Sequence, residues 1–191
     1  MNEIEIFTNR IKDDLTESRI NLRIALLFIP VGFLTYLFHE FGHWIIGEIL
    51  GEKMVLSLNN AAPWNGYYVE KTHELYILIG GPAFTILQAI IFWVVIENTK
   101  SIYVYPFVFF AAFCRFFSII FGGFNRQDEA KISSILDIGA YTVAMIVLII
   151  LLLIVWRSSK LFKLNLKAIS YYTVLSTLSI LLVIGVDTLI T

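Results

Sequence analysis

The sequence predicts an all-α integral membrane protein, with about five transmembrane helices and a short interfacial β-hairpin after the first. Three observations support this prediction: the composition, five long apolar stretches, and one polar interruption between the first two of them. Of the 191 residues, 58% are hydrophobic and only 15% are charged, and the mean hydropathy is +0.79. Soluble globular domains are close to half apolar and a quarter charged, so the composition excludes that class, and it equally excludes a disordered chain.

The charge and cysteine counts exclude two further classes. The formal net charge is −1, which gives no basic surface for nucleic acid. Cys114 is the single cysteine, so the chain has no internal disulfide and no cysteine-based zinc finger. We therefore expect no nucleic-acid partner, and the few polar residues of this apolar chain are the candidates for function.

The first segment, residues 1–21, is polar. Its apolar residues Ile4, Phe7, Ile11 and Leu15 recur at helical spacing, which predicts a short amphipathic helix. Such a helix either lies at the membrane surface or is a solvated leader without membrane contact, and the pattern favours neither.

Residues 22–191 are expected to form a single membrane domain with no soluble domain attached. Five apolar stretches lie at approximately 24–50, 75–96, 102–121, 138–156 and 168–190. Each is close to the ~20 residues that a helix needs to cross ~30 Å of hydrocarbon. Helices are expected because lipid offers no hydrogen-bond partner to backbone N–H and C=O groups. We therefore expect a multi-pass protein of the cell membrane.

The interruption at residues 52–73 is expected to form the β-hairpin. Met54–Leu58 and Tyr67–Val69 have strand-like composition. Turn signals lie between them, at Asn59-Asn60 and at Pro63–Gly66. This order of strand, turn and strand predicts a hairpin at the membrane interface.

The first apolar stretch contains His39-Glu40-Phe41-Gly42-His43. Residues four apart lie on one face of a helix, so both imidazoles can direct a nitrogen at one zinc ion. Glu40 lies beside them and can take a proton from zinc-bound water, as in the metalloprotease helix. Two structural histidines are the alternative interpretation. It is weak, because ionisable groups in lipid cost free energy unless they are paired or functional.

A catalytic zinc ion needs a third protein ligand and one open position. The candidates for the third ligand are Asp128, Glu129, Asp137, Glu48, His73 and Asp187. At about 1.5 Å per residue, His39 lies ~22 Å along a helix that begins at Ile24, near the exit side of the first span. The second span enters and the third span exits on that side. We therefore expect four parts of the chain at one membrane face: the histidines, Gly80-Gly81-Pro82, the hairpin and the segment around Asp128.

Arg115 lies inside the third apolar stretch. Charges within a membrane are usually functional, paired, or directed toward the interface. We expect Arg115 to pair with an acidic residue such as Glu97 or Asp137, or to reach the interface. A role at the metal site is the alternative.

The chain resembles the site-2 protease family of intramembrane zinc metalloproteases, in particular a small bacterial-type member. The resemblance rests on the 39–43 motif, Gly80-Gly81-Pro82 and a late acidic residue. The resemblance covers roughly residues 24–140. It implies a single zinc ion per chain, held by His39, His43 and Asp128, with Glu40 as general base. Asp137 is the alternative third ligand. The candidates for substrate positioning are Gly81, Pro82, Thr85 and Asn125.

The resemblance implies a zinc-dependent endopeptidase that cleaves membrane-embedded proteins or peptides. Its expected partners are the lipid bilayer and a membrane-spanning substrate, and the sequence leaves the oligomeric state open. One alternative is a catalytically inactive interaction module of the same fold, although such a module has no need for Glu40 beside two histidines. Another is a metal transporter, which needs ligand residues along several spans, whereas only the first span carries such a cluster.

Overall fold

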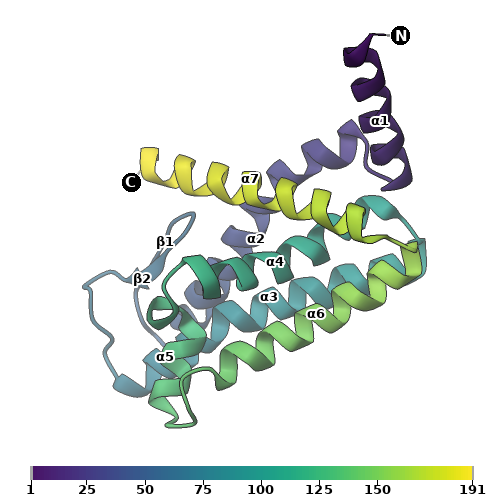
Figure 1. The fold of residues 1–191 in the computed structure, drawn as a ribbon. Coiled ribbons are helices and arrows are strands. Elements are labelled where there is room, and N and C mark those ends of the chain that lie inside the picture. Colours follow the sequence, from purple (N-terminus) through teal and green to yellow (C-terminus); the bar gives the residue numbers. More distant parts are fainter. Residues whose placement is uncertain (1, 191) are drawn as a thin grey trace.

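The computed structural model describes residues 2–190, and most of them are helical (Figure 1). The elements in chain order are α1 (Glu3–Glu17), α2 (Leu22–Ile49), β1 (Met54–Leu56), β2 (Ala61–Pro63), α3 (Lys71–Thr99), α4 (Tyr105–Phe121), α5 (Asp128–Ile135), α6 (Thr142–Phe162) and α7 (Leu166–Ile190). Single turns of 3-10 helix precede α4, at Ile102–Val104, and α5, at Phe124–Arg126. The predicted fold class, helices with one early hairpin, is confirmed.

Among the described residues, five helices are long and apolar enough to cross a membrane: α2, α3, α4 with the turn before it, α6 and α7. Their outward-facing side chains are large and apolar, and Leu26, Ile91 and Leu153 are about half exposed. Soluble proteins rarely expose so much apolar surface to water, so these helices fit a lipid environment. The protein is therefore a multi-pass membrane protein.

The fourth span begins and ends later than the predicted stretch 138–156. Gly139 has a φ of 90°, which an α-helix does not adopt, so the helix begins only at Thr142. At the other end it continues to Phe162 and stops where Lys163 takes a left-handed φ of 52°. Backbone conformation, and not the limit of the apolar stretch, sets both ends.

The hairpin is shorter than expected. Met54 pairs with Pro63 and Leu56 with Ala61 in an antiparallel register. The prediction that Tyr67–Val69 forms the second strand is wrong, because the chain turns back at Asn59-Asn60, where the Ser57 N–H donates to the Asn60 carbonyl at 2.8 Å. The residues directly after this tight turn therefore pair with β1, and Tyr67–Val69 is irregular.

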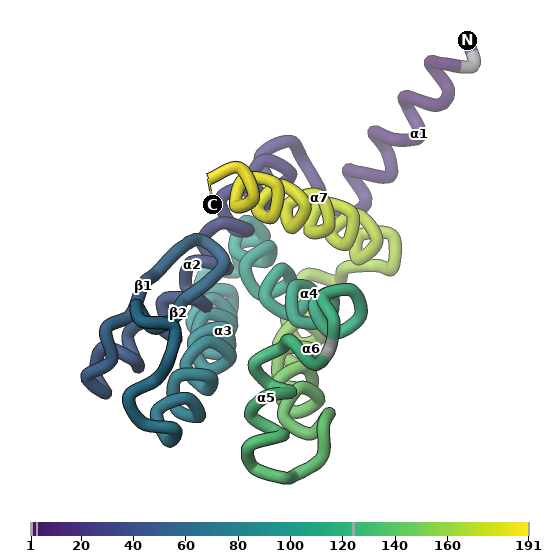
Figure 2. The backbone as a smooth tube through the Cα atoms, turned by 90° about the vertical axis from the view of Figure 1, so that its left-hand side faces the viewer, coloured from purple at the N-terminus to yellow at the C-terminus, as the bar shows by residue number. Residues whose placement is uncertain are grey.

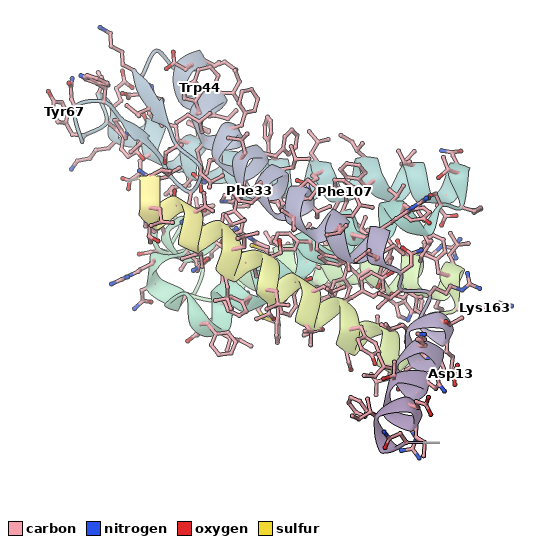
Figure 3. The ribbon with its side chains drawn as sticks, turned by 90° about the horizontal axis from the view of Figure 1, so that it is seen from above. Asp13, Phe33, Trp44, Tyr67, Phe107 and Lys163 are labelled. Carbon is pink, nitrogen blue, oxygen red and sulfur yellow. The ribbon has the colours of Figure 1, made fainter. Side chains whose placement is uncertain are left out.

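The two ends of the helical bundle differ in their side chains. Figure 3 shows Trp44 and Tyr67 at one end and Asp13 and Lys163 at the other. In Figures 1 and 2, the hairpin and α5 lie at the same end, where α2 finishes and α3 begins. The expectation that these segments share one membrane face agrees with this arrangement.

The predicted N-terminal helix is present as α1, which projects away from the bundle (Figure 1). Its attachment includes an ion pair between Lys167 of α7 and Asp14 at 2.8 Å. Ile4 and Phe7 are exposed. Contact of this helix with a membrane surface stays a prediction.

The centre of the bundle is α4, which packs against α3, α6, α2 and α7. Tyr105, Val108 and Phe110 are fully buried along it. Tyr172 of α7 stacks edge-on against Tyr105 with ring centroids 4.8 Å apart. Burial of large side chains from both helices holds α7 across the bundle.

α2 and α3 approach each other closely through glycine. A Cβ added at Gly42 would overlap the backbone of Gly80, and a Cβ added at Gly80 would overlap the backbone of Gly42. Small residues at such a crossing let two membrane helices pack backbone against backbone. This contact brings the second half of α2, with its histidines, against the first half of α3.

We predict that Gly80→Ala destabilises the protein by about 1–3 kcal/mol, because the added methyl group overpacks the crossing with α2. The measurement is the midpoint of thermal unfolding in detergent. The matched control is Gly185→Ala on α7, where an added Cβ meets no atom within 4 Å. The control should leave the midpoint unchanged or raise it, since alanine is the better helix former. Equal midpoints for both variants would contradict the crossing.

A buried carboxylate ties the loop after α2 to the start of α3. Glu52 accepts hydrogen bonds from the Val69 N–H at 2.9 Å and from His73 Nδ1 at 2.8 Å. Burial raises the pKa of Glu52, but the hydrogen bonds from His73 and Val69 outweigh it and hold the pKa below its ordinary value of 4.5. The ionised form is therefore the one that the fold stabilises.

The contribution of Glu52 to stability should depend on pH. A carboxyl group whose pKa is lower in the folded state stabilises the fold above the unfolded-state pKa and loses that effect as the pH falls through the folded-state pKa. We predict that Glu52→Gln lowers the thermal midpoint at about pH 7, and that its difference from the wild type shrinks below pH 4.5. A difference that stays constant down to about pH 3 would refute this account.

Candidate metal centre

Three potential ligand atoms converge between α2 and α5. His39 and His43, one turn apart on α2, have their Nε2 atoms 3.3 Å apart. Asp128, the first residue of α5, has its Oδ2 atom 3.1 Å from His39 Nε2 and 3.2 Å from His43 Nε2. Among the described residues, this is the group of His, Cys, Asp and Glu side chains arranged to hold a metal ion.

The spacing of these atoms fits zinc. In a tetrahedral site, bonds of about 2.0–2.2 Å to nitrogen and carboxylate oxygen place neighbouring ligand atoms about 3.3–3.5 Å apart. The distances here, 3.1, 3.2 and 3.3 Å, are close to that spacing. Burial raises the pKa of Asp128, but its hydrogen bonds to both histidines outweigh burial and hold the pKa well below its ordinary value. The carboxyl group is therefore ionised, as a metal ligand must be.

The other ring nitrogens of the histidines have partners that fix the tautomer. His43 Nδ1 donates to the Ile77 carbonyl oxygen at 2.7 Å. The Thr85 hydroxyl donates to the Gly81 carbonyl at 3.2 Å, so its oxygen accepts from His39 Nδ1 at 3.0 Å. Since both Nδ1 atoms are engaged as donors, the Nε2 atoms are the ring nitrogens left to bind a metal. Such outer hydrogen bonds are typical of histidines that bind a metal.

Two of the predicted substrate-positioning residues of α3, Gly81 and Thr85, lie against the histidines. A Cβ added at Gly81 would overlap both imidazole rings, so glycine is required there for the rings to fit. Thr85 contacts His39, as described. Pro82, which follows Gly81 in the chain, is buried. Pro82 lacks an N–H, which leaves the carbonyl four residues earlier without its helical hydrogen bond. Gly81 and Thr85 thus support the ligands.

Asn125 and Asp137 lie elsewhere. Both line a second cavity of about 540 Å³, together with Glu74 and Ser133. Asp128 opens α5, whereas Asp137 follows its other end, and a helix of eight residues is about 12 Å long. The structure therefore brings Asp128, and not Asp137, to the histidines, and it does not bring Asn125 to them.

The remaining third-ligand candidates are engaged or lie outside the group. Glu48 accepts from the Met54 N–H at 2.9 Å, and His73 bonds Glu52. Glu129 pairs with Arg115 at 3.3 Å. Asp187, near the end of α7, is not part of the three-ligand group found among the described residues.

The histidines and Asp128 face a cavity of about 470 Å³. Glu40 lines it too and is only 8% exposed, and Ala61 and Ala62 of the hairpin line the same cavity. Residues that the sequence did not single out complete the wall, and they include Tyr36, Asn59, Asn60, Tyr68, Arg126 and Lys131. The turn signal at Asn59-Asn60 marked the hairpin, but nothing in the sequence placed that turn beside Glu40.

The prediction that Arg115 pairs with Glu97 or Asp137 is wrong. Arg115 bonds Glu129 on α5, and Glu97 instead bonds Lys100 and Arg157, each at 3.0 Å. The chain turns sharply after α4, and this brings Glu129 back to Arg115. Arg115 also lines the cavity that holds the histidines.

Comparisons with protein-family models, with curated proteins and with solved structures find no match to this chain. The residues and their geometry are therefore the basis on which a function is assigned.

The two aspartates can be separated by metal content. We predict about one zinc ion per chain in the purified wild type and in Asp137→Ala, and a large loss in Asp128→Ala, because only Asp128 contacts both histidines. The measurement is elemental analysis of protein purified in detergent and supplied with zinc. Loss of zinc in Asp137→Ala with retention in Asp128→Ala would contradict the ligand set.

Proposed function

We propose that the protein is an intramembrane zinc metalloprotease, which hydrolyses peptide bonds of membrane-embedded protein or peptide substrates. The observation that carries the proposal is the meeting of His39 Nε2, His43 Nε2 and Asp128 Oδ2 in a cavity that Glu40 also lines. Three protein ligands beside a cavity leave a fourth position for water or substrate, which is the arrangement of a catalytic rather than a structural zinc site.

A bound zinc ion supplies Lewis-acid chemistry, since it polarises a carbonyl group and makes water more acidic. Asp128 and the two histidines would hold it, and the bonds from Ile77 and Thr85 keep both imidazoles in the orientation that this requires. The same bonds keep a proton on each Nδ1 atom, so that Nε2 is the atom each ring offers to a metal.

Glu40 is the general base in this proposal. Its carboxylate accepts a proton from the attacking water and later gives it to the leaving amide nitrogen as the C–N bond breaks. Ala61 of β2 lines the same cavity, so the hairpin borders the space in which Glu40 would act.

The position of the cavity suits a substrate that comes from the membrane. His39 is ten residues before the end of α2, about 15 Å along the helix, so water can reach the site from that face. Hairpin residues Asn59 to Ala62 line the cavity, and an extended peptide would run beside them. A transmembrane helix that unwinds near the membrane face provides such a peptide.

We predict that Glu40→Gln lowers the rate of cleavage by about 10² to 10⁴, because glutamine cannot accept the proton. Zinc should stay bound, since the three ligands are unchanged. The assay reconstitutes the protein in liposomes with a panel of single-span peptides and detects new peptide ends by mass spectrometry. The control is Glu48→Gln, two turns further along α2 and bonded to Met54, which should cleave normally.

Two outcomes would contradict the proposal. Equal cleavage by the wild type and Glu40→Gln would exclude Glu40 as the base. A biological activity that survives in Glu40→Gln, together with no cleavage by the wild type, would favour an interaction module. Zinc uptake into sealed liposomes by the wild type would instead favour a transporter.

A further inference from the structure

Arg115 and Glu129 form a buried ion pair beside the candidate metal centre. Their side chains are 11% and 5% exposed, and Arg115 Nη1 lies 3.3 Å from Glu129 Oε1. The other Lys or Arg pairs of the described residues, such as Arg157 with Glu97, are on the surface. A buried pair of this kind costs desolvation, so its position next to a functional site calls for an explanation.

The pair connects α4 directly to the residue after Asp128. Asp128 and Glu129 are the first two residues of α5, and successive residues of a helix point about 100° apart. One carboxylate therefore faces the histidines while the other faces Arg115. Both belong to the same rigid turn, so a contact that holds Glu129 also holds the backbone of Asp128.

Apart from the contacts of Asp128 with the histidines and the packing of α5 on α3 and α6, few contacts hold that turn. Gln127, the N-cap residue, makes no side-chain cap to the helix, and its Nε2 atom donates to the Ser118 carbonyl of α4 at a long 3.3 Å. Ser133 accepts from the Val143 N–H, but it lies more than one turn further along α5. The charge-assisted contact of Glu129 with Arg115 is thus the polar attachment that joins the start of α5 to the inside of α4.

We propose that Arg115 is a positioning residue, which acts through Glu129 to fix the first turn of α5 and so holds Asp128 Oδ2 against His39 and His43. The metal part of this inference rests on the proposed function, whereas the tether between α4 and α5 does not. Arg115 need not touch substrate or metal for this role.

The first test is zinc affinity, measured by competition with a chelator. Groups that orient a metal ligand typically account for 10- to 100-fold in affinity, so Arg115→Met and Glu129→Gln should weaken zinc binding by about that factor. Arg115→Lys keeps the charge but not the planar guanidinium group, so its zinc affinity should lie between that of these variants and that of the wild type. Arg157→Met is the matched control, because it breaks the exposed pair with Glu97 and should bind zinc normally.

A double variant separates positioning from charge balance. Arg115→Met with Glu129→Met removes both charges, so no buried charge is left unpaired and the protein is expected to fold. The tether predicts that this variant still binds zinc weakly. Recovery of wild-type affinity in the double variant would overturn the proposal, since charge balance alone would then explain the single variants.

The second test is amide hydrogen exchange in the metal-free protein. Residues 128–135 should exchange faster in Arg115→Met and in the double variant than in the wild type, while residues 142–162 of α6 keep their protection. Unchanged exchange in α5 would overturn the proposal whether or not zinc binds. A wild type that binds no zinc, with faster α5 exchange in the variants, would refute the proposed function and leave the tether standing.

Discussion

The cost of placing ionisable side chains among membrane helices is the constraint on which this structure depends. Each such group loses its hydration and stays only where another group compensates it. His39 and His43 contact Asp128, Arg115 pairs with Glu129, and Glu40 lies at the cavity that these groups line. These compensating contacts all lie around one cavity, so the requirement for partners also assembles the candidate site.

Close packing makes this assembly possible. The crossing at Gly42 and Gly80 removes the side chains that would separate α2 from α3, and Gly81 leaves room for the two imidazole rings. The carbonyl of Ile77 and the hydroxyl of Thr85 then reach the Nδ1 atoms. A larger residue at any of these glycines would disturb the orientation of the ligands as well as the packing.

The sequence predicts most of the fold because the apolar length of a membrane helix is visible in one dimension. It also predicts that His39 and His43 share a face, since their spacing is local. The second strand is missed because Ala61–Pro63 has weak strand propensity and pairs only through the turn before it. The pair of Arg115 with Glu129 is missed because it depends on the direction in which the chain leaves α4. The resemblance favours Asp128 over Asp137, and α5, about 12 Å long, separates the two so that only Asp128 reaches the histidines.

The donor set is divided between the beginning and the middle of the chain. Both histidines are on α2, whereas Asp128 follows α4. The ribosome makes the N-terminal part first, so the histidine helix is inserted before residue 128 exists. The centre can be completed only after three spans have crossed the bilayer and the chain has turned back at the end of α4. Under the proposed function, insertion would therefore precede metal loading, and a chain that stops early or inserts α4 incorrectly carries two histidines without their third partner.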